Sequence, residues 1–552
     1  MLRLPRLSRR ETLEVTEEPE GSGPLVEPPE AIGGVIDTYR VPKTATEDAS
    51  ARVFIVEEGG LGRYLVRPPR LTQYEEGALK VLKSNLLNSV PAGTGQDPRA
   101  LMEEQLVTVA EEAGLADLVK RSKSKLLYHL GREFAGFWEV DPLVNDDEVE
   151  EISVTRWDKP VRVLHRRFSE FAFMETDVAY PDEARLQAFV RRLAQLGGTT
   201  VSLAQPSLEV TLHGASDRRV TATLGDEISR PGSTYAIRKQ REKPLTLTQL
   251  SAQEQGGLGR VKADPGEAPR GYEENHSHKT LSVLMAAYFW LLLESTTNVL
   301  IAGETNSGKT TLMNAMLALT HPSSKIVTAE DVLEINLPEH LHWERLKTRS
   351  HRAGLSPSSS RYEYDLSSLL KLALRFSPTI LSLGEMRGEE SEALAAAITL
   401  GFSTMTTIHA ENAEMCVQRL TTPPMRFEEG HVRDITAVAT IRKIALSDGR
   451  VARRVVSVDE IKPVGPDGHA VVNVFRYDYS TDSFSPTTPA EVVDRSYRLG
   501  RIAANIGLTP AGVQESLASR AAHISRSVAE ERFDSAGLSK MVKEFAAEVR
   551  AG

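Results

Sequence analysis

The residues best suited to chemistry form a glycine-rich loop that ends in a lysine and a threonine. The loop fits the pattern G-x-x-x-x-G-K-[ST]; with the residue after it, it comprises Gly303, Glu304, Thr305, Asn306, Ser307, Gly308, Lys309, Thr310 and Thr311. Glycines let backbone amides point at phosphate oxygens, and a helix start adds partial positive charge. Lys309 would reach the β and γ phosphates, and Thr310 would hold Mg²⁺. The loop therefore predicts binding of a nucleoside triphosphate.

The segments on either side of this loop match the context that such a motif needs. The apolar run at residues 298–302 predicts a strand before the loop, and residues 311–319 favour a helix after it. The alternative is a chance match in a surface loop, which would not explain both flanking elements.

Two further apolar runs, each typical of a buried strand, end in carboxylates. Glu330 and Asp331 follow residues 326–329, and Glu385 follows residues 379–383. Glu330 at such a turn would orient the attacking water, and Glu385 would face Mg²⁺, directly or through water. In the alternative interpretations, Glu330 and Asp331 cap the following segment, and Glu385 is a surface residue at a strand end.

A fourth apolar run, residues 401–408, ends in His409. By itself a histidine at a strand end is weak evidence, because it is more often packed or hydrogen-bonded than catalytic. Nothing nearby has the ligand spacing of a metal site.

The elements that must position these residues predict an α/β fold. Helix and strand patterns alternate from residue 281 to about residue 407, which favours a mainly parallel sheet covered by helices. Before it, residues 148–250 carry several strand patterns around one helix at residues 182–196, which predicts a separate α+β region.

Composition sets limits on location and partners. The 552 residues carry a formal charge of −10 and are 40% hydrophobic and 26% charged, which excludes a disordered or fibrous chain. The single cysteine, Cys416, cannot form an internal disulfide or a cysteine-rich zinc site, which favours the cytoplasm. The most apolar run, residues 281–293, is shorter than the roughly 20 residues of a membrane-crossing helix, and the charged start is unlike a secretory signal. We therefore expect a cytoplasmic protein whose association with a membrane is peripheral.

The four motifs together resemble those of the type II/type IV secretion ATPases, the motors of secretion systems, type IV pili and the archaellum. GETNSGKTT, TAEDVLE, LSLGEMRGEE and GFSTMTTIHAEN occur in the family's order, and the match covers about residues 148–463. The resemblance implies that Glu330 is the catalytic carboxylate, Glu385 the Walker B glutamate and His409 a sensor of the nucleotide state. It also implies arginines that reach the phosphates from the preceding domain.

Three arginines are candidates for that role. Arg219, Arg230 and Arg238 lie in the stretch that is similar to the family's arginine-bearing segment. A planar, permanently charged donor would stabilise charge on the γ phosphate in the transition state. The alternative for each is a solvated arginine on a strand.

The resemblance also implies a domain order and an assembly. It predicts a RecA-like P-loop ATPase domain preceded by α+β domains, with ATP held between the last two domains. We expect a homohexamer that hydrolyses ATP and acts on a polytopic membrane platform protein. The expected segments are a tail (1–34), an α+β region with a helical connector (35–147), a PAS-like domain (148–252), a linker or insertion (253–278), the ATPase domain (279–489) and a helical tail (490–552).

Two sequence features favour an archaeal-type branch, a motor of a type IV pilus or archaellum. The chain lacks the four-cysteine zinc element of many bacterial type II enzymes, and it has GEMRGEE at the Walker B strand. An ATPase for conjugative or effector transfer would share all four motifs. A nucleic-acid translocase would use the basic runs at residues 120–125 and 165–167, although no nucleic acid is expected from the acidic composition. A scaffold that binds ATP without turnover would not need Glu330 and Glu385.

Overall fold

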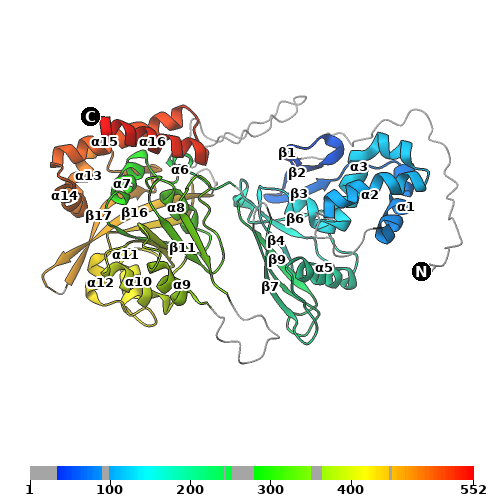
Figure 1. Cartoon of the computed structure of the whole chain (residues 1–552), viewed down its shortest axis with the longest axis horizontal. Helices are drawn as coiled ribbons and strands as arrows, with labels where there is room; N and C mark the ends of the chain where they lie inside the picture. Colours follow the sequence, from blue (N-terminus) through cyan, green and yellow to red (C-terminus); the bar gives the residue numbers. More distant parts are fainter. Residues whose placement is uncertain are drawn as a thin grey trace. The chain divides into compact units, whose positions relative to one another are not determined.

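The computed structural model describes residues 34–89, 98–214, 217–241, 243–251, 279–349, 364–446, 451–466 and 468–551. These residues fall into two compact units, unit 1 up to residue 240 and unit 2 from residue 241 (Figure 1). The predicted tail, apart from Gly34, and the predicted insertion at residues 253–278 lie outside the described residues.

Unit 1 is built on one sheet, in which nine strands are described in the order β1-β2-β3-β6-β5-β4-β9-β8-β7. All neighbouring strands are antiparallel except β3 and β6. The strands are β1 (Val35–Val41), β2 (Ala51–Glu58), β3 (Leu61–Arg67), β4 (Val149–Val154), β5 (Arg162–His165), β6 (Phe173–Thr176), β7 (Ser207–Leu212), β8 (Arg218–Thr223) and β9 (Thr234–Lys239). The boundary expected at residues 147/148 therefore runs through a continuous sheet, because β3 pairs with β6 across it.

The helices of unit 1 form two groups. Helix α5 covers the sheet because Leu186, Phe189 and Leu193 recur at helical spacing on its buried face, and Asp182 caps its start by accepting from the Arg185 amide. Helices α1, α2 and α3 pack on one another around a separate apolar cluster. The helices are α1 (Gln73–Ser89), α2 (Pro98–Glu112), α3 (Ala116–Phe134), α4 (Asp141–Val144) and α5 (Glu183–Leu196).

Unit 2 contains the predicted mainly parallel sheet, which confirms the α/β fold class. Its described strands have the order β12-β11-β13-β14-β10-β15-β16-β17-β18, parallel from β12 to β15 and antiparallel beyond. They are β10 (Asn298–Ala302), β11 (Ile326–Glu330), β12 (Trp343–Lys347), β13 (Ile380–Leu383), β14 (Ser403–Ile408), β15 (Ala437–Ala445), β16 (Val451–Val464), β17 (Gly468–Asp478) and β18 (Ser483–Ser485).

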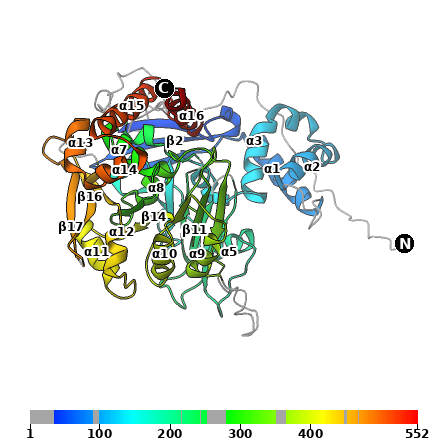
Figure 2. The same cartoon turned by 60° about the vertical axis from the view of Figure 1, so that its left-hand side comes forward.

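Helices cover both faces of this sheet, which is why β10, β11 and β13 are buried along their whole length. In β10, Val299 and Ile301 face the layer of α7 and α8, whereas Leu300 and Ala302 face the layer of α9 to α12 (Figure 2). The helices are α6 (Leu247–Ser251), α7 (Val283–Leu293), α8 (Lys309–Leu317), α9 (Leu366–Leu374), α10 (Glu390–Thr399), α11 (Ala413–Thr421), α12 (Glu429–Asp434), α13 (Pro489–Arg495), α14 (Tyr497–Ile506), α15 (Pro510–Ala529) and α16 (Ser535–Ala551).

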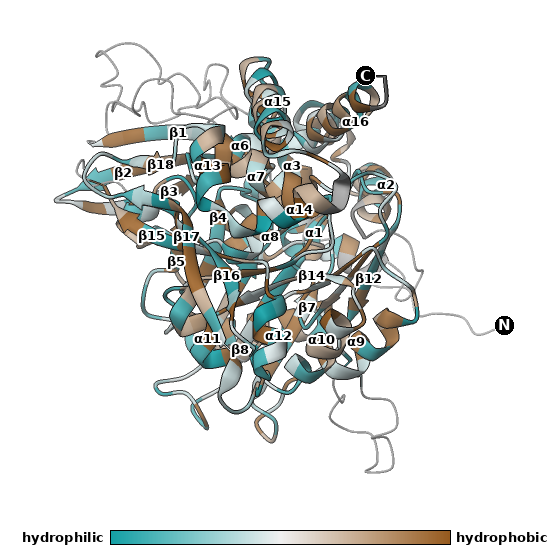
Figure 3. Cartoon of the chain, turned by 90° about the vertical axis from the view of Figure 1, so that its left-hand side faces the viewer, coloured by the Kyte–Doolittle hydropathy of each residue, from teal (hydrophilic) through white to brown (hydrophobic). Residues whose placement is uncertain are grey.

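The C-terminal helices belong to the core of unit 2 and do not form a separate tail. Helix α15 packs on α7 (Figure 1), and the rings of Trp290 and Phe545 lie 4.7 Å apart between α7 and α16. Hydrophobic and hydrophilic residues alternate along α15 and α16 (Figure 3), as expected for helices with one buried face. Helix α6 joins the same core through Leu247 and Leu250, so unit 2 begins before the boundary expected at residue 253.

None of the helices that the structure describes combines the length and the apolar character needed to cross a bilayer. The most apolar run of the sequence, residues 281–293, contains α7, which is buried inside unit 2.

Candidate functional site

The glycine-rich loop joins β10 to α8, as the sequence predicts. Gly308 caps α8 with φ of +100°, and Asn306 also has a left-handed backbone with φ of +61°. A Cβ on Gly303 would lie 2.4 Å from the carbonyl oxygen of Ile441, so a larger residue does not fit there. Glycine is therefore required at Gly308 by conformation and at Gly303 by space.

The loop has the features of an anion site. The first amides of α8 have no acceptor within the helix, and the helix start carries partial positive charge. Ser307 is 1% exposed, and its hydroxyl has no hydrogen-bond partner among the described residues. Lys309 donates from Nζ to the Glu304 carbonyl oxygen at 2.8 Å. Together these groups supply the donors and the charge that a phosphate chain would need.

Glu330 lies at the end of β11 with 1% of its surface exposed. Its Oε1 accepts hydrogen bonds from the amides of Glu334 and Ile335, each at 2.8 Å. Its Oε2 has no hydrogen-bond partner within the described ranges and lies 3.7 Å from Arg345 Nε. One oxygen thus holds the following turn, as the capping interpretation proposed, and the other remains available for chemistry.

Burial sets the protonation of Glu330. Desolvation raises the pKa of this carboxyl group to about 7, although the two backbone hydrogen bonds and Arg345 lower it. A carboxyl group with a pKa near neutrality can exchange a proton at physiological pH.

Glu385 and His409 contact each other beside Lys309. His409 Nε2 lies 2.8 Å from Glu385 Oε1, and His409 Nδ1 lies 3.4 Å from Lys309 Nζ. The other oxygen of Glu385 accepts from the guanidinium of Arg387. Burial raises the pKa of Glu385, but Arg387 and the neighbouring cations outweigh it and leave that pKa below its ordinary value. Burial and Lys309 lower the pKa of His409, so its neutral form is favoured at neutral pH.

Parallel strand register brings these groups together. Ala302 pairs with Ile408, so the phosphate loop and His409 start from neighbouring strand ends. Leu383 pairs with Ala329 on one side and Thr406 on the other, which places Glu385 between Glu330 and His409. All four motifs therefore meet at the carboxyl edge of one sheet, where α/β folds bind ligands.

The donor set fits Mg²⁺ only as a partner of phosphate. Among the described residues there is no group of three or more His, Cys, Asp or Glu side chains that could hold a metal ion. Thr310, in the first turn of α8, and Glu385 are the oxygen donors that the sequence predicts for Mg²⁺, which commonly completes its shell with phosphate oxygens and water.

The three candidate arginines lie in unit 1 and are exposed. Arg219 on β8 and Arg238 on β9 are cross-strand neighbours, and Arg219 forms an ion pair with Glu209. Arg238 also pairs in register with Glu151 on β4. Arg230 lies in the loop between β8 and β9. The structure therefore groups Arg219 and Arg238 on one face of the sheet.

Three further arginines belong to the site in unit 2. Arg345 approaches Glu330, Arg387 contacts Glu385, and Arg453 donates from Nε to the Asn306 carbonyl oxygen at 3.3 Å. Arg387 could have been found from its place two residues after Glu385. Arg345 and Arg453 lie outside the four motifs. Strand pairing alone brings them to the site, so no local sequence pattern could have found them.

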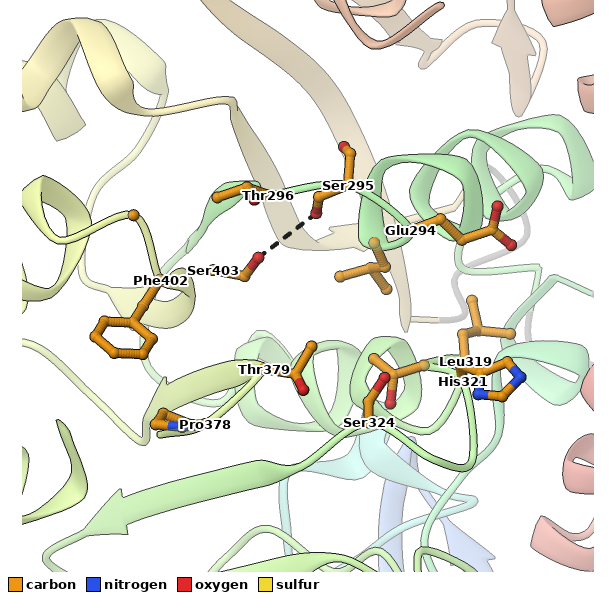
Figure 4. A pocket seen from close by; sticks show the side chains of 13 residues that line it. Glu294, Ser295, Thr296, Leu319, His321, Ser324, Pro378, Thr379, Phe402 and Ser403 are labelled. Carbon is orange, nitrogen blue, oxygen red and sulfur yellow. Dashed lines mark hydrogen bonds between the residues drawn. The ribbon is translucent and has the colours of Figure 1, made fainter. Parts of the chain in front are cut away.

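A pocket of about 510 Å³ lies at the opposite edge of the sheet (Figure 4). Its lining residues precede the strands, among them Ser324 before β11, Thr379 before β13 and Ser403 at the start of β14. Gly401, Phe402 and Ser403 at the start of the fourth motif line it, but the phosphate loop, Glu330, Glu385 and His409 do not. The candidate site is therefore at the carboxyl edge and not in this pocket.

Comparison with known proteins gives a family. A profile described as "Type II/IV secretion system protein" matches residues 278–446. An uncharacterized protein of Methanocaldococcus jannaschii is 37% identical over 244 residues, which are 44% of this chain and 86% of that protein. The type IV secretion system protein PtlH of Bordetella pertussis is 40% identical over 124 residues, 22% of this chain and 35% of PtlH.

The crystal structure of the pilus retraction motor PilT with bound ADP covers 59% of this chain and 83% of its own, with 14% identity and a TM-score of 0.37. The matched profile contains the phosphate loop, Glu330, Glu385 and His409. The chain belongs to the type II/type IV secretion ATPase superfamily.

Proposed function

We propose that the protein is an ATP-hydrolysing motor of a type IV pilus, an archaellum or a related secretion machine. The observation that carries this proposal is the convergence of Lys309, Glu330, Glu385 and His409 at one edge of the sheet of unit 2. This arrangement offers a phosphate cradle, a buried carboxylate at Glu330, and a histidine that links Lys309 of the cradle to Glu385.

Each group has a distinct part in hydrolysis. The amides of the loop and Lys309 hold the phosphate chain, which releases Lys309 from the Glu304 carbonyl. Glu330 orients a water toward the γ phosphorus and accepts its proton through Oε2, while the bond to the bridging oxygen breaks and ADP leaves. Its pKa near 7 suits this task, because it can take up a proton and lose it again.

Thr310 and Glu385 would hold Mg²⁺, which would neutralise charge on the phosphates. His409 links Lys309 to Glu385, so a change at the phosphates would alter the contact of His409 with both. This position supports its proposed role as a sensor of the nucleotide state.

The arginines of unit 1 would complete the site during a domain movement. Arg219, Arg230 and Arg238 are exposed, and such donors would stabilise charge on the γ phosphate when the two units close on ATP. A swing of this kind needs different contacts in the open and closed states, and the γ phosphate supplies them. We propose that six copies form a ring and that their motion acts on a polytopic membrane platform protein at the inner face of the membrane.

Two observations bear on the pathway. The match to the protein from Methanocaldococcus jannaschii, an archaeon, covers 86% of that protein. This match supports an archaeal-type motor. The match to PtlH supports the alternative of a transfer or secretion ATPase.

A nucleic-acid translocase is less well supported, because one of its two proposed basic runs, residues 165–167, is engaged in the fold, although Lys120 and Arg121 of the other run are exposed. His165 is fully buried, Arg166 donates to the Lys239 carbonyl, and Arg167 pairs with Asp37 and Glu148.

The proposal is tested by phosphate release from the full chain with ATP and Mg²⁺, with and without membrane fractions. We expect Lys309→Ala to lose ATP binding and Glu330→Gln to bind ATP while hydrolysis falls by at least about 100-fold. Glu344→Gln, which changes an exposed carboxylate on β12, is the control and keeps the wild-type rate. Wild-type turnover in Glu330→Gln would refute the catalytic assignment, and absence of both binding and turnover in the wild type would refute the motor.

A further inference from the structure

Arg453 reaches the phosphate loop from a strand that no motif marks. It lies near the start of β16, which pairs with β15, and β15 in turn pairs with β10. Ala302, the last residue of β10, is level with Thr440, so the rest of β15 runs past the end of β10 and flanks the loop. Arg453 pairs with Lys443 on this extension.

A register shift directs Arg453 to the loop. Thr440 pairs with Ser457, but Ile441 pairs with Val455, so Val456 is an extra residue in β16. Such a bulge changes which side chains of the strand share a face with the partner strand. With the bulge, Arg453 lies on the face of Ile441, whose side chain borders Gly303 and Gly308.

The neighbouring arginine shows the effect of the shift. Arg454 points away from that face, is 1% exposed and is paired with Asp482. In an unbroken ladder Arg454, and not Arg453, would share the face of Ile441.

The contacts of Arg453 fall on the strained part of the loop. Its Nε donates to the carbonyl oxygen of Asn306 at 3.3 Å. Asn306 has φ of +61°, a left-handed conformation that asparagine adopts more readily than most L residues but less readily than glycine. The side chain also lies over Gly308, where an added Cβ would be 3.2 Å from Arg453 Cδ. One side chain therefore touches both left-handed positions of the loop.

We propose that Arg453 is a positioning residue of the phosphate loop, which holds the Asn306 peptide in its left-handed turn so that the loop amides stay open toward phosphate. This inference rests on the proposed nucleotide binding and adds the residue that prepares the loop for it. The role acts on the part of the loop that ATP and ADP share, so it applies to both nucleotides equally.

The test measures binding of ADP and of a slowly hydrolysed ATP analogue to the full chain by calorimetry. We expect Arg453→Met to raise both dissociation constants by about tenfold and by the same factor, with the melting temperature of the nucleotide-free protein changed little. Lys443→Met, which removes an exposed charge from the cross-strand neighbour, is the matched control and should change either constant less than twofold.

A second variant tests the turn itself. Glycine adopts a left-handed backbone without help, so in an Asn306→Gly background the further change Arg453→Met should weaken binding less than threefold. Should Arg453→Met fail to fold, Arg453→Leu, which also lacks an N–H donor, replaces it in both backgrounds.

Four outcomes would overturn the inference. In Arg453→Met, the two dissociation constants could stay unchanged, or only that of the ATP analogue could rise. Lys443→Met could weaken binding as much as Arg453→Met does, or Arg453→Met could weaken binding about tenfold in the Asn306→Gly background as well. If the wild type binds nucleotide and Lys309→Ala does not, any of these outcomes refutes the role of Arg453 and leaves the proposed function intact. If the wild type binds neither nucleotide, the proposed function itself fails.

Discussion

Replacing Glu330 with glutamine removes a buried carboxyl group and leaves a neutral amide of similar shape. Burial raises the pKa of Glu330 from 4.5 to about 7. A raised pKa means that the folded protein favours the protonated form. The stability that this preference contributes is fully present below pH 4.5 and is lost as the pH rises through about 7.

The size of the effect follows from these two values. The gap between 4.5 and about 7 corresponds to about 3 kcal/mol of unfolding free energy, at roughly 1.4 kcal/mol per pH unit. About 2 kcal/mol of this is lost between pH 5.5 and pH 8. Glu330→Gln cannot titrate, so its stability should fall by about 2 kcal/mol less than that of the wild type over this range.

Urea unfolding of both proteins without nucleotide, followed by circular dichroism at pH 5.5 and pH 8, measures the difference. Comparing the two pH values cancels any cost of packing the glutamine amide beside Arg345. Glu344→Gln on the neighbouring strand should follow the wild type at both pH values. If the gap in stability between wild type and Glu330→Gln is the same at pH 5.5 and pH 8, the carboxyl group is not perturbed by burial and the reasoning is refuted.

Three further predictions concern other parts of the molecule. Gly308→Ala should destabilise the protein by about 1–2 kcal/mol and abolish nucleotide binding, because alanine resists φ of +100°. Gly430→Ala in α12 is the control and should change neither stability nor binding. Thermal melting measures the stability, and calorimetry measures the binding. Burial raises the pKa of the Cys416 thiol to about 12, so a thiol reagent at pH 8 should label it only after unfolding, and rapid labelling of the native protein would contradict this. Alanine at Arg219 or at its cross-strand neighbour Arg238 should lower the turnover number at least tenfold. The melting temperature should not change, because both side chains are exposed. Unchanged turnover in the single variants and in the double variant would exclude both arginines from the reaction.

Much of the candidate site could be predicted because each of its parts is local in sequence. The loop at residues 303–310 and the strand ends at Glu330, Glu385 and His409 are each short segments, and parallel strands place their carboxyl ends at one edge. The contact of His409 with both Lys309 and Glu385 turns a residue that was weak evidence alone into part of the site.

The features that sequence patterns missed depend on long-range pairing. Arg453 reaches the loop only because Val456 is an extra residue in β16, and no local pattern reports a bulge. The expected boundary at residues 147/148 followed a local change from helix to strand patterns, but β3 pairs with β6 across it. The last helices suggested a tail because their own pattern does not reveal that α7 is their partner.

The strands and helices after β15 determine whether a truncated form of the protein stays in solution. A fragment that stops at residue 446, where the family profile ends, would keep the phosphate loop, Glu330, Glu385 and His409. It would also leave the backbone of β15 without its antiparallel neighbour and the aromatic side chains of Tyr288 and Trp290 open to water. A bare strand edge beside an apolar helix invites association between copies, so such a fragment would precipitate despite its intact signature sequences.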